Sequence, residues 1–383
     1  MTPAESVDFI VVGAGMAGAS VAAKLALHGR VVVLEAEAHA GYHSTGRSAA
    51  LYSQAYGNAT VRALTRASWS FFVKPPEGFA PAPLLRLRDT MFPAAKHQGE
   101  LLEAFRADPM LHAHTILLDA RAAASRVPIL QRDLLAGAVL DPTSADIDVD
   151  LLLQGFLRQA RSRGAQVLLN AAVTEIAHQN SAWTVRTATH SFQAPIVVNA
   201  AGAWANELAA LAGVGAMPLQ PMRRTAALIA VPEGLDASDW PAVIAIDESF
   251  YFKPDAGLLL ISPADEHPSP ACDAQPEELD VAIAVDRFET ATGRQVRQVK
   301  HQWAGLRVFS PDRTPVIGFD ADAPGFFWCA GQGGYGIQTA PCLGRVAAKL
   351  ALGKPLPEAV AALGVQAQQL SPRRFASAPL REA

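Results

Sequence analysis

The sequence predicts an α/β protein that combines a Rossmann-type dinucleotide-binding domain with an antiparallel-sheet α+β domain. Three observations predict this class. Residues 7–35 read as strand, glycine turn, helix and strand, and a strand leading into a glycine turn and helix recurs near residues 202 and 333. Residues 220–261 alternate between apolar and polar positions, as antiparallel strands do. One domain is therefore visited three times by the chain, with a β-rich domain inserted between the visits.

The first of these units carries the residues that a bound dinucleotide needs. The apolar strand 7–12 runs into Gly13-x-Gly15-x-x-Gly18, and the next strand ends on Glu35. The glycines allow a tight turn, a close approach to a pyrophosphate and close helix–sheet packing, and Glu35 can accept hydrogen bonds from a ribose. The candidate cofactor-binding residues of this unit are Gly13, Gly15, Met16, Ala17, Gly18, Glu35 and Ala36.

Composition narrows the function classes. The chain has 383 residues, 50% apolar and 18% charged, with a net charge of -4. This charge gives no general attraction for nucleic acid or anionic lipid. The first strand leaves no room for a signal peptide, and no apolar run is long enough to span a bilayer. Cys272, Cys329 and Cys342 lack metal-ligand spacing and are expected to be buried thiols in a reducing cytoplasm. No metal is expected. The protein is expected in the cytoplasm, and the alternative is a peripheral association with the inner membrane.

The remaining elements follow from local signals. Asp148 is a plausible N-cap for a helix whose apolar residues recur at helical spacing from Leu151 to Ala160, and Gly164 ends it. Further expected strands are 166–169, 173–176, 183–187, 191–193, 196–199 and 325–330, and further expected helices are 279–292 and 337–352. The predicted dinucleotide-binding domain comprises 1–84, 145–214 and 305–383, and the second domain comprises 85–144 and 215–304.

Two further segments favour FAD over a nicotinamide cofactor. Gly41–Ala50 gathers hydroxyls, a guanidinium and small residues in one loop that can wrap a pyrophosphate and reach a flavin ring. Gly331–Thr339 opens a helix, whose positive end could stabilise the negative N1/C2 region of a flavin. The candidate cofactor-binding residues of these and the middle unit are Ser44, Thr45, Gly46, Arg47, Ser48, Ala49, Ala50, Val173, Ala201, Gly202, Trp204, Gly331, Gly333, Gly334, Tyr335, Gly336, Ile337, Gln338 and Thr339.

With these motifs in place, the chain resembles the FAD-dependent D-amino acid oxidase superfamily, and within it the bacterial D-arginine and D-amino acid dehydrogenases. The resemblance runs over nearly the whole length and rests on GAGMAGAS (13–20), GYHSTGRSAA (41–50), VVNAAGAW (197–204), DESFYFKPDAG (247–257), WAGLR (303–307) and QGGYGIQT (332–339). It implies a glutathione-reductase-type FAD domain, a smaller antiparallel substrate domain, and an active site between them.

The resemblance also implies roles for particular side chains. Arg224 and Arg307 match the arginines that clamp the substrate carboxylate, and Tyr251 matches a tyrosine that touches it. Tyr56 matches a residue of a mobile covering loop, and Gly334 a backbone group that meets the substrate amine. The planar fork of a guanidinium suits a carboxylate, which agrees with these assignments. Arg223 should point to the opposite face if its segment is a strand.

Two positions depart from the pattern of the arginine enzymes. Leu51 replaces a histidine and Thr90 replaces a glutamate in the pocket for the substrate side chain; Asp89 is one position earlier. A neutral threonine lacks the charge-assisted bond, worth ~1.5–3 kcal/mol, that holds a cationic side chain. These departures predict a preference for neutral or apolar D-amino acids over D-arginine, unless a shifted loop lets Asp89 supply the charge.

The predicted reaction is oxidative deamination of a D-amino acid by a dehydrogenase, giving an imino acid that water converts to a 2-oxo acid and ammonia. The electron acceptor is expected to be a quinone or another carrier. The 303–309 segment contains no cysteine, so FAD is expected to be non-covalent. The alternatives are a glycine- or sarcosine-type amine oxidase, a 2-hydroxy acid dehydrogenase, and a flavin-bearing accessory subunit without turnover of its own.

Overall fold

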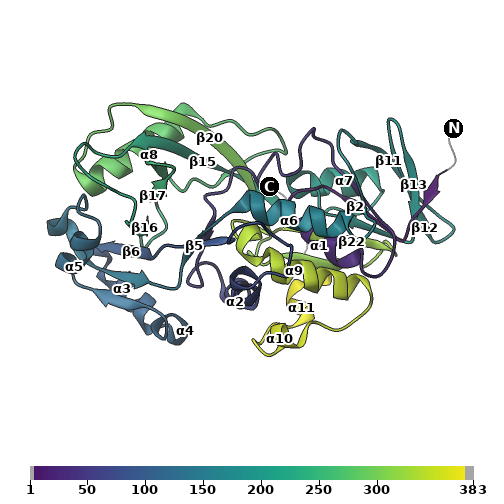
Figure 1. Cartoon of the computed structure of the whole chain (residues 1–383), viewed down its shortest axis with the longest axis horizontal. Coiled ribbons are helices and arrows are strands. Elements are labelled where there is room, and N and C mark those ends of the chain that lie inside the picture. The colour runs from purple at the N-terminus through teal and green to yellow at the C-terminus, as the bar shows by residue number, and fades with distance from the viewer. Residues whose placement is uncertain (1–3, 376–383) are drawn as a thin grey trace.

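The computed structural model describes residues 4–375, and it confirms the predicted α/β class. The outermost parts of the predicted domain ranges, 1–3 and 376–383, lie outside the described residues. Figure 1 shows an elongated molecule, with one large sheet and its helices on the right and a second large sheet on the left.

The right-hand sheet has six strands in the order β10-β3-β2-β14-β22-β21, and all neighbours are parallel except the last pair. Its inner strands are mostly apolar and buried, because both faces of the sheet are covered, whereas the edge strand β10 is partly exposed. Their bounds are β2 (Phe9–Val12), β3 (Val31–Leu34), β10 (Gln166–Leu168), β14 (Ile196–Asn199), β21 (Val316–Phe319) and β22 (Phe326–Ala330).

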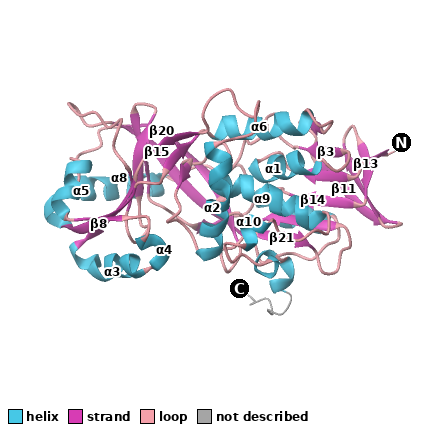
Figure 2. Cartoon of the chain, turned by 60° about the horizontal axis from the view of Figure 1, so that its bottom comes forward, coloured by secondary structure: helices cyan, strands magenta, loops and turns pink. Residues whose placement is uncertain are grey.

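Helices cover one face of this sheet, and a smaller sheet lies on its other side (Figure 2). The helices are α1 (Met16–Leu25), α2 (Ala59–Val73), α6 (Val149–Arg161) and α9 (Gly336–Ala351). The smaller sheet contains β1 (Glu5–Ser6), β13 (Ser191–Ala194), β12 (Ala182–Thr187) and β11 (Val173–Gln179), in that order. Small residues let α1 and α9 pack closely, since a Cβ on Gly344 would lie 2.7 Å from the Ser20 carbonyl oxygen.

The predicted N-cap of α6 is confirmed. The Asp148 carboxylate accepts a hydrogen bond from the Leu151 amide at 2.8 Å, which satisfies one of the free donors at the helix start. Gly164, which the sequence predicted as the stop signal, lies just beyond the helix with φ +84°. The apolar stripe between them packs into the core beneath α1.

The left-hand sheet has nine strands in the order β19-β15-β18-β17-β16-β6-β8-β7, and β20 also pairs with β15. Helices α5 (Ala120–Arg126) and α8 (Glu278–Thr292) pack on one face. The strands are β6 (Thr90–Ala95), β7 (Ile116–Leu118), β8 (Leu135–Asp141), β15 (Gln220–Ala230), β16 (Ala242–Ile244), β17 (Tyr251–Asp255), β18 (Leu258–Ser262), β19 (His267–Pro268) and β20 (Val299–Phe309).

A three-stranded sheet contains β4 (Leu51–Tyr52), β9 (Ala145–Ile147) and β5 (Leu85–Leu87), and Figure 1 shows β5 between the two large sheets. Strand β20 crosses the predicted boundary at residue 305 without a break. The short helices are α3 (Gly99–Ala107), α4 (Pro109–His112), α7 (Ala205–Leu211), α10 (Glu358–Ala361) and α11 (Ala367–Leu370).

Within residues 4–375, none of the helices combines the length and apolar character needed to cross a bilayer. The same residues hold no group of three or more His, Cys, Asp or Glu side chains arranged to bind a metal ion. Cys329 and Cys342 are buried free thiols, but Cys272 is exposed, so its predicted burial is wrong. Cys272 lies in a proline-rich loop outside both large sheets, where little chain covers it.

Candidate active site

A groove runs along the carboxyl ends of β2, β3 and β14, and we call it the dinucleotide groove. Its volume is about 470 Å³. Gly13 has φ +101°, and a Cβ there would lie 2.5 Å from the Ala200 carbonyl oxygen. A Cβ on Gly18 would lie 1.9 Å from the Gly13 oxygen. Both positions therefore require glycine for the close packing that opens the groove. Residues predicted for cofactor binding that line it are Gly13, Gly15, Glu35, Ala36, Ser44, Thr45, Val173, Ala201, Gly202 and Trp204.

The carboxylate of Glu35 is held in place at the groove wall. Its oxygens accept hydrogen bonds from the amides of Ala14 at 2.7 Å and Glu37 at 3.0 Å. These two bonds leave further lone pairs for a ribose hydroxyl, because an ionised carboxylate accepts about four hydrogen bonds. The arrangement agrees with the role that the sequence predicted for this residue.

His43 is a groove residue that the sequence reasoning missed, although it lies inside the GYHSTG motif. Its Nε2 is 2.9 Å from a Glu37 carboxylate oxygen, and its ring packs on Trp204 with centroids 4.5 Å apart. Its Nδ1 is buried and has no hydrogen-bond partner in the described part of the chain. An orphaned polar atom beside an open groove fits a polar cofactor that supplies the missing bond. Together with the glycine packing and Glu35, this observation indicates that the groove fits the dinucleotide part of FAD.

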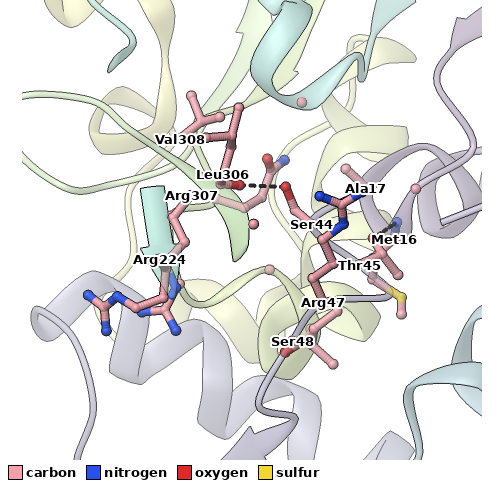
Figure 3. Close-up of a pocket in the computed structure, with 18 of the residues that line it drawn as sticks. Met16, Ala17, Ser44, Thr45, Arg47, Ser48, Arg224, Leu306, Arg307 and Val308 are labelled. Carbon is pink, nitrogen blue, oxygen red and sulfur yellow. Dashed lines mark hydrogen bonds between the residues drawn. The ribbon is translucent and has the colours of Figure 1, made fainter. Parts of the chain in front are cut away.

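A second hollow, the central cavity, adjoins the groove and shares part of its wall (Figure 3). Its volume is about 140 Å³. The Met16 amide donates to the Thr45 hydroxyl at 3.0 Å, and the Ser44 hydroxyl donates to the Leu306 carbonyl, so the 41–50 loop is tied to both α1 and β20. Predicted cofactor residues that line this cavity are Gly15, Met16, Ala17, Ser44, Thr45, Arg47, Ser48, Gly202, Gly333, Gly334, Gly336 and Ile337.

Arg47 lines the central cavity, but its guanidinium also binds protein groups. It donates to the carbonyls of Ala274 at 2.8 Å and Ala304 at 3.0 Å, and it forms a salt bridge with Asp273. Arg47 therefore fastens the 271–277 loop to β20 and the 41–50 loop. Its proposed contact with FAD remains a prediction.

Some residues predicted to bind the cofactor do not line any of these cavities. Gly18, Gly46, Gly331, Tyr335 and Thr339 line neither the groove nor the central cavity nor the clamp cavity described next. Thr339 is fully buried and donates to the Tyr335 carbonyl at 2.7 Å. Gln338 touches the clamp cavity, yet its amide is already bonded to the Ser53 amide at 3.1 Å and the Thr65 hydroxyl at 2.9 Å.

The clamp cavity, of about 70 Å³, lies beyond the central cavity and shares walls with it. Arg224 comes from β15 and Arg307 from the neighbouring β20, and both line the two cavities with Tyr251 of β17. Gly334 and Tyr56 complete the wall. The five predicted catalytic residues, which are far apart in the sequence, are thus brought together. Ala49 and Ala50 also line this cavity.

Arg307 is the unusual member of this group. Its side chain is half-buried at the wall of both cavities, and its Nη1 donates to the Tyr56 hydroxyl at 3.3 Å. No carboxylate among the described residues forms a salt bridge with it. A Cβ on Gly334 would lie 2.9 Å from this Nη1, so glycine leaves the guanidinium its room. The pKa of Arg307 is raised against the effect of burial by Tyr56, Tyr251 and Glu266, so the group stays charged and can pair with an anion in the cavity.

Arg224 is partly engaged by protein groups. Its Nε donates to the Asp265 carbonyl at 2.7 Å and its Nη2 to Glu266 at 3.0 Å. Burial, and next the charge of Arg307, lower the pKa of Arg224. Arg223 points to the opposite face, where it pairs with Glu277 and Asp280, as strand alternation predicted.

The wall for the substrate side chain differs from the prediction. Leu51 lines the clamp cavity as expected, together with Ile244, Ala264 and Ile337. Thr90 does not line it: this residue is fully buried in β6, where it pairs with Ala242 of β16 and Asp141 of β8. Ile244, two residues further along β16, forms the wall instead.

Asp89, which could have supplied the charge if the loop were shifted by one residue, does not line the cavity among the described residues. Asp89 forms a salt bridge with Arg126 at 3.3 Å outside it. A different carboxylate, Glu248, lines the cavity from the turn before β17. Burial raises the pKa of Glu248 against the opposing charges of Arg313, Arg224 and Arg307. The sequence does show an acidic residue just before the strand of Tyr251, and this could have indicated Glu248 as a cavity residue. The turn that carries Glu248 has a left-handed φ of +56°, which the sequence did not predict.

Comparisons with known proteins agree with this geometry. A family model described as "FAD dependent oxidoreductase" matches residues 8–350. The chain is 28% identical over 218 residues to the uncharacterized oxidoreductase YurR of Bacillus subtilis, covering 55% of this chain and 56% of that protein. It is 28% identical over 229 residues to mitochondrial sarcosine dehydrogenase of Mus musculus, covering 56% of this chain and 25% of that protein. The chain thus spans about half the length, or less, of these curated relatives.

Solved structures show the same fold. L-proline dehydrogenase from P. horikoshii superposes with a TM-score of 0.84 at 23% identity, covering 99% of this chain and 100% of that one. Glycine oxidase from Geobacillus kaustophilus superposes with a TM-score of 0.79 at 22% identity, covering 91% and 95%. L-α-glycerophosphate oxidase from Mycoplasma pneumoniae, solved with FAD bound, gives 0.82 at 17% identity, covering 91% and 95%.

Proposed function

The chain belongs to the FAD-dependent oxidoreductase family, and we propose that it is a dehydrogenase that oxidises the α-carbon of small neutral D-amino acids. The observation that carries the proposal is the half-buried guanidinium of Arg307, which forms no salt bridge with a carboxylate of the described chain and lines a cavity beside the cofactor hollows. An amino acid brings the missing carboxylate.

When bound, FAD would supply the two-electron acceptor, and the residues that line the central cavity would hold its reactive ring against the substrate. Arg307 and the free edge of Arg224 hold the carboxylate, because two planar forks fix both its place and its orientation. The hydroxyls of Tyr56 and Tyr251 line the same cavity and restrict the remaining rotation. The clamped α-carbon is thereby directed to the wall shared with the central cavity.

Tyr56, which matches a residue of a covering loop, contributes to the wall of the site. It packs edge-on against Tyr335 with ring centroids 4.9 Å apart, and its hydroxyl accepts a hydrogen bond from Arg307 Nη1 at 3.3 Å. These contacts hold the Tyr56 side chain beside the guanidinium that would bind the carboxylate. Among the described residues, no histidine lines the clamp cavity, so we propose that the amine enters deprotonated or passes its proton to water.

The preference for neutral side chains rests on the wall composition. Leu51, Ile244, Ala264 and Ile337 offer apolar surface, and the one carboxylate of the wall, Glu248, already faces the charges of nearby arginines. We propose that FAD is held without a covalent bond, since no cysteine lines the groove or either cavity. Acid precipitation should then release the yellow colour into the supernatant.

A second candidate is oxidation of glycine or sarcosine. The small volume of the clamp cavity, about 70 Å³, favours it, because such a space suits a substrate with little or no side chain. A related protein named sarcosine dehydrogenase and a structural neighbour titled glycine oxidase agree with this candidate.

Anaerobic bleaching of the flavin tests these proposals. Purified holoenzyme is mixed under nitrogen with D- and L-amino acids, glycine, sarcosine and 2-hydroxy acids, and absorbance near 450 nm is followed. D-Alanine and similar D-amino acids should bleach the flavin fastest, while R307M, with its colour retained, should not respond. Fastest bleaching by glycine or sarcosine would support the second candidate, and by a hydroxy acid would contradict both. Low peroxide yield in air would separate a dehydrogenase from an oxidase.

A further inference from the structure

Glu266 lies behind the clamp and holds two arginines at once. Its Oε1 accepts from Arg224 Nη2 at 3.0 Å and from Arg313 Nη2 at 2.7 Å, and its Oε2 accepts from Arg313 Nη1 at 2.9 Å. Glu266 does not line the clamp cavity. Its position is fixed by the fork of Arg313, whose guanidinium packs over the Phe309 ring at 4.0 Å from the centroid. A ligand in the cavity therefore meets Glu266 through its charge and through Arg224.

The charge of the clamp follows from these pairings. Five groups influence one another here: the guanidiniums of Arg224, Arg307 and Arg313, and the carboxylates of Glu248 and Glu266. Burial alone would raise the pKa of Glu266, but the hydrogen bonds and charge of Arg313, then the charges of Arg224 and Arg307, hold it below its ordinary value. Three positive charges thus face two negative ones. One guanidinium charge remains, and Arg307 is the member without a carboxylate partner.

We propose that Glu266 sets the substrate class of the clamp: by cancelling one arginine charge, it restricts the cavity to ligands that carry a single carboxylate. The inference rests on the proposed function, since it assumes that the clamp binds a carboxylate. One carboxylate neutralises the remaining guanidinium charge. A second carboxylate finds no unpaired cation, and it adds negative charge beside Glu248 in a space of about 70 Å³.

The arrangement of Arg224 supports this assignment. Its Nε and Nη2 are already bonded to Asp265 and Glu266, which leaves chiefly Nη1 for a ligand. Arg307 is therefore the main binding group for the carboxylate, and Arg224 contributes an additional contact from the side. If Glu266 lost its charge, both guanidiniums would act with full strength, and a dicarboxylate would meet two unpaired cations.

The test uses the FAD holoenzyme and two ligands that cannot be oxidised, acetate and malonate. Perturbation of the flavin absorbance spectrum gives each dissociation constant. E266Q keeps the hydrogen-bond acceptor for Arg224 and removes the charge. Because Coulomb energy scales with ligand charge, we expect acetate to bind about tenfold more tightly and malonate about a hundredfold. E277Q is the matched control, since Glu277 pairs with Arg223 on the opposite face of β15, and neither constant should change.

R313Q supplies an opposite change and a safeguard should E266Q fail to fold. It removes one positive charge and leaves Glu266 paired with Arg224 alone, so acetate should bind more weakly and malonate more weakly still. An unchanged ratio of malonate to acetate affinity in either variant would refute the role of Glu266. Acetate that binds wild type and R307M equally would refute the carboxylate clamp, and with it the proposed function.

Discussion

Replacement of Gly334 by alanine tests the clamp with the smallest possible change. Gly334 does not have a left-handed backbone, so alanine brings no strain there. Its Cβ would lie 2.9 Å from Arg307 Nη1, 3.3 Å from Arg307 Cζ and 3.2 Å from the Tyr56 hydroxyl. The nearest atom is the far end of a flexible side chain, so the fold can accommodate the methyl group. Arg307 must move to do so, and the expected damage is to binding.

The expected loss follows from the bond that is displaced. A charge-assisted hydrogen bond contributes about 1.5–3 kcal/mol. Its loss corresponds to a decrease of about 10- to 150-fold in kcat/KM, since each 1.4 kcal/mol is about a factor of ten. Dye-coupled steady-state kinetics on the substrate identified by flavin bleaching would measure this decrease. Acetate binding to the oxidised enzyme should weaken by a comparable factor.

The matched control for G334A is G215A, because Gly215 also has no left-handed backbone and its Cβ would meet nothing within 4 Å. Both variants should keep their FAD and unfold within a few degrees of wild type. A G334A enzyme with kcat/KM within twofold of wild type, and with unchanged acetate affinity, would show that Arg307 does not hold the carboxylate.

Three other predictions concern the cofactor, a helix and the buried charge. G18A should purify without FAD, as judged by absorbance at 450 nm relative to 280 nm, because its Cβ would collide with the Gly13 carbonyl at 1.9 Å; a yellow variant would contradict this. D148A should lower the free energy of unfolding by about 1 kcal/mol in urea titrations through loss of the α6 cap, and no change would refute the role of that bond. R307M should unfold at the same temperature as the ligand-free wild type or higher, and acetate should stabilise only the wild type. A large decrease in its melting temperature would show that Arg307 is structural.

The local elements were predictable because their signals are short-range. The strand at 196–199 was predicted to the residue, and the cap at Asp148 was identified from a side chain three positions before the amide it binds. Apolar runs that are buried on both faces, and glycines that no other residue can replace, leave a strong pattern in sequence.

The clamp was harder to predict, since its contacts join distant segments. Alternation showed that Arg223 and Arg224 point to opposite faces, but it could not show which face meets the cavity. The structure decides this by placing α8 with its acidic residues beside Arg223. Glu266 and Arg313 come from two loops 47 residues apart, and no spacing rule connects them. Thr90 was assigned to the pocket by analogy of position, whereas Ile244 of the adjacent strand takes that place.

Arg307 differs from two other arginines of the chain in having no carboxylate partner among the described residues. Arg88 is buried and forms a salt bridge with Asp146 at 2.5 Å, and Arg223 pairs with two carboxylates. In both cases the protein supplies the anion that makes burial of the charge tolerable. Arg307 is half-buried, and among the described residues it forms no salt bridge, its side-chain hydrogen bond being to the Tyr56 hydroxyl. Under the proposed function, the substrate carboxylate is the counterion of Arg307, and its binding gains from a charge that no protein carboxylate has paired. The proposed role of Glu266 follows from the same difference between paired and unpaired arginines. Adding or removing one carboxylate beside Arg224 and Arg307 would change the number of carboxylates that a ligand needs to neutralise the clamp.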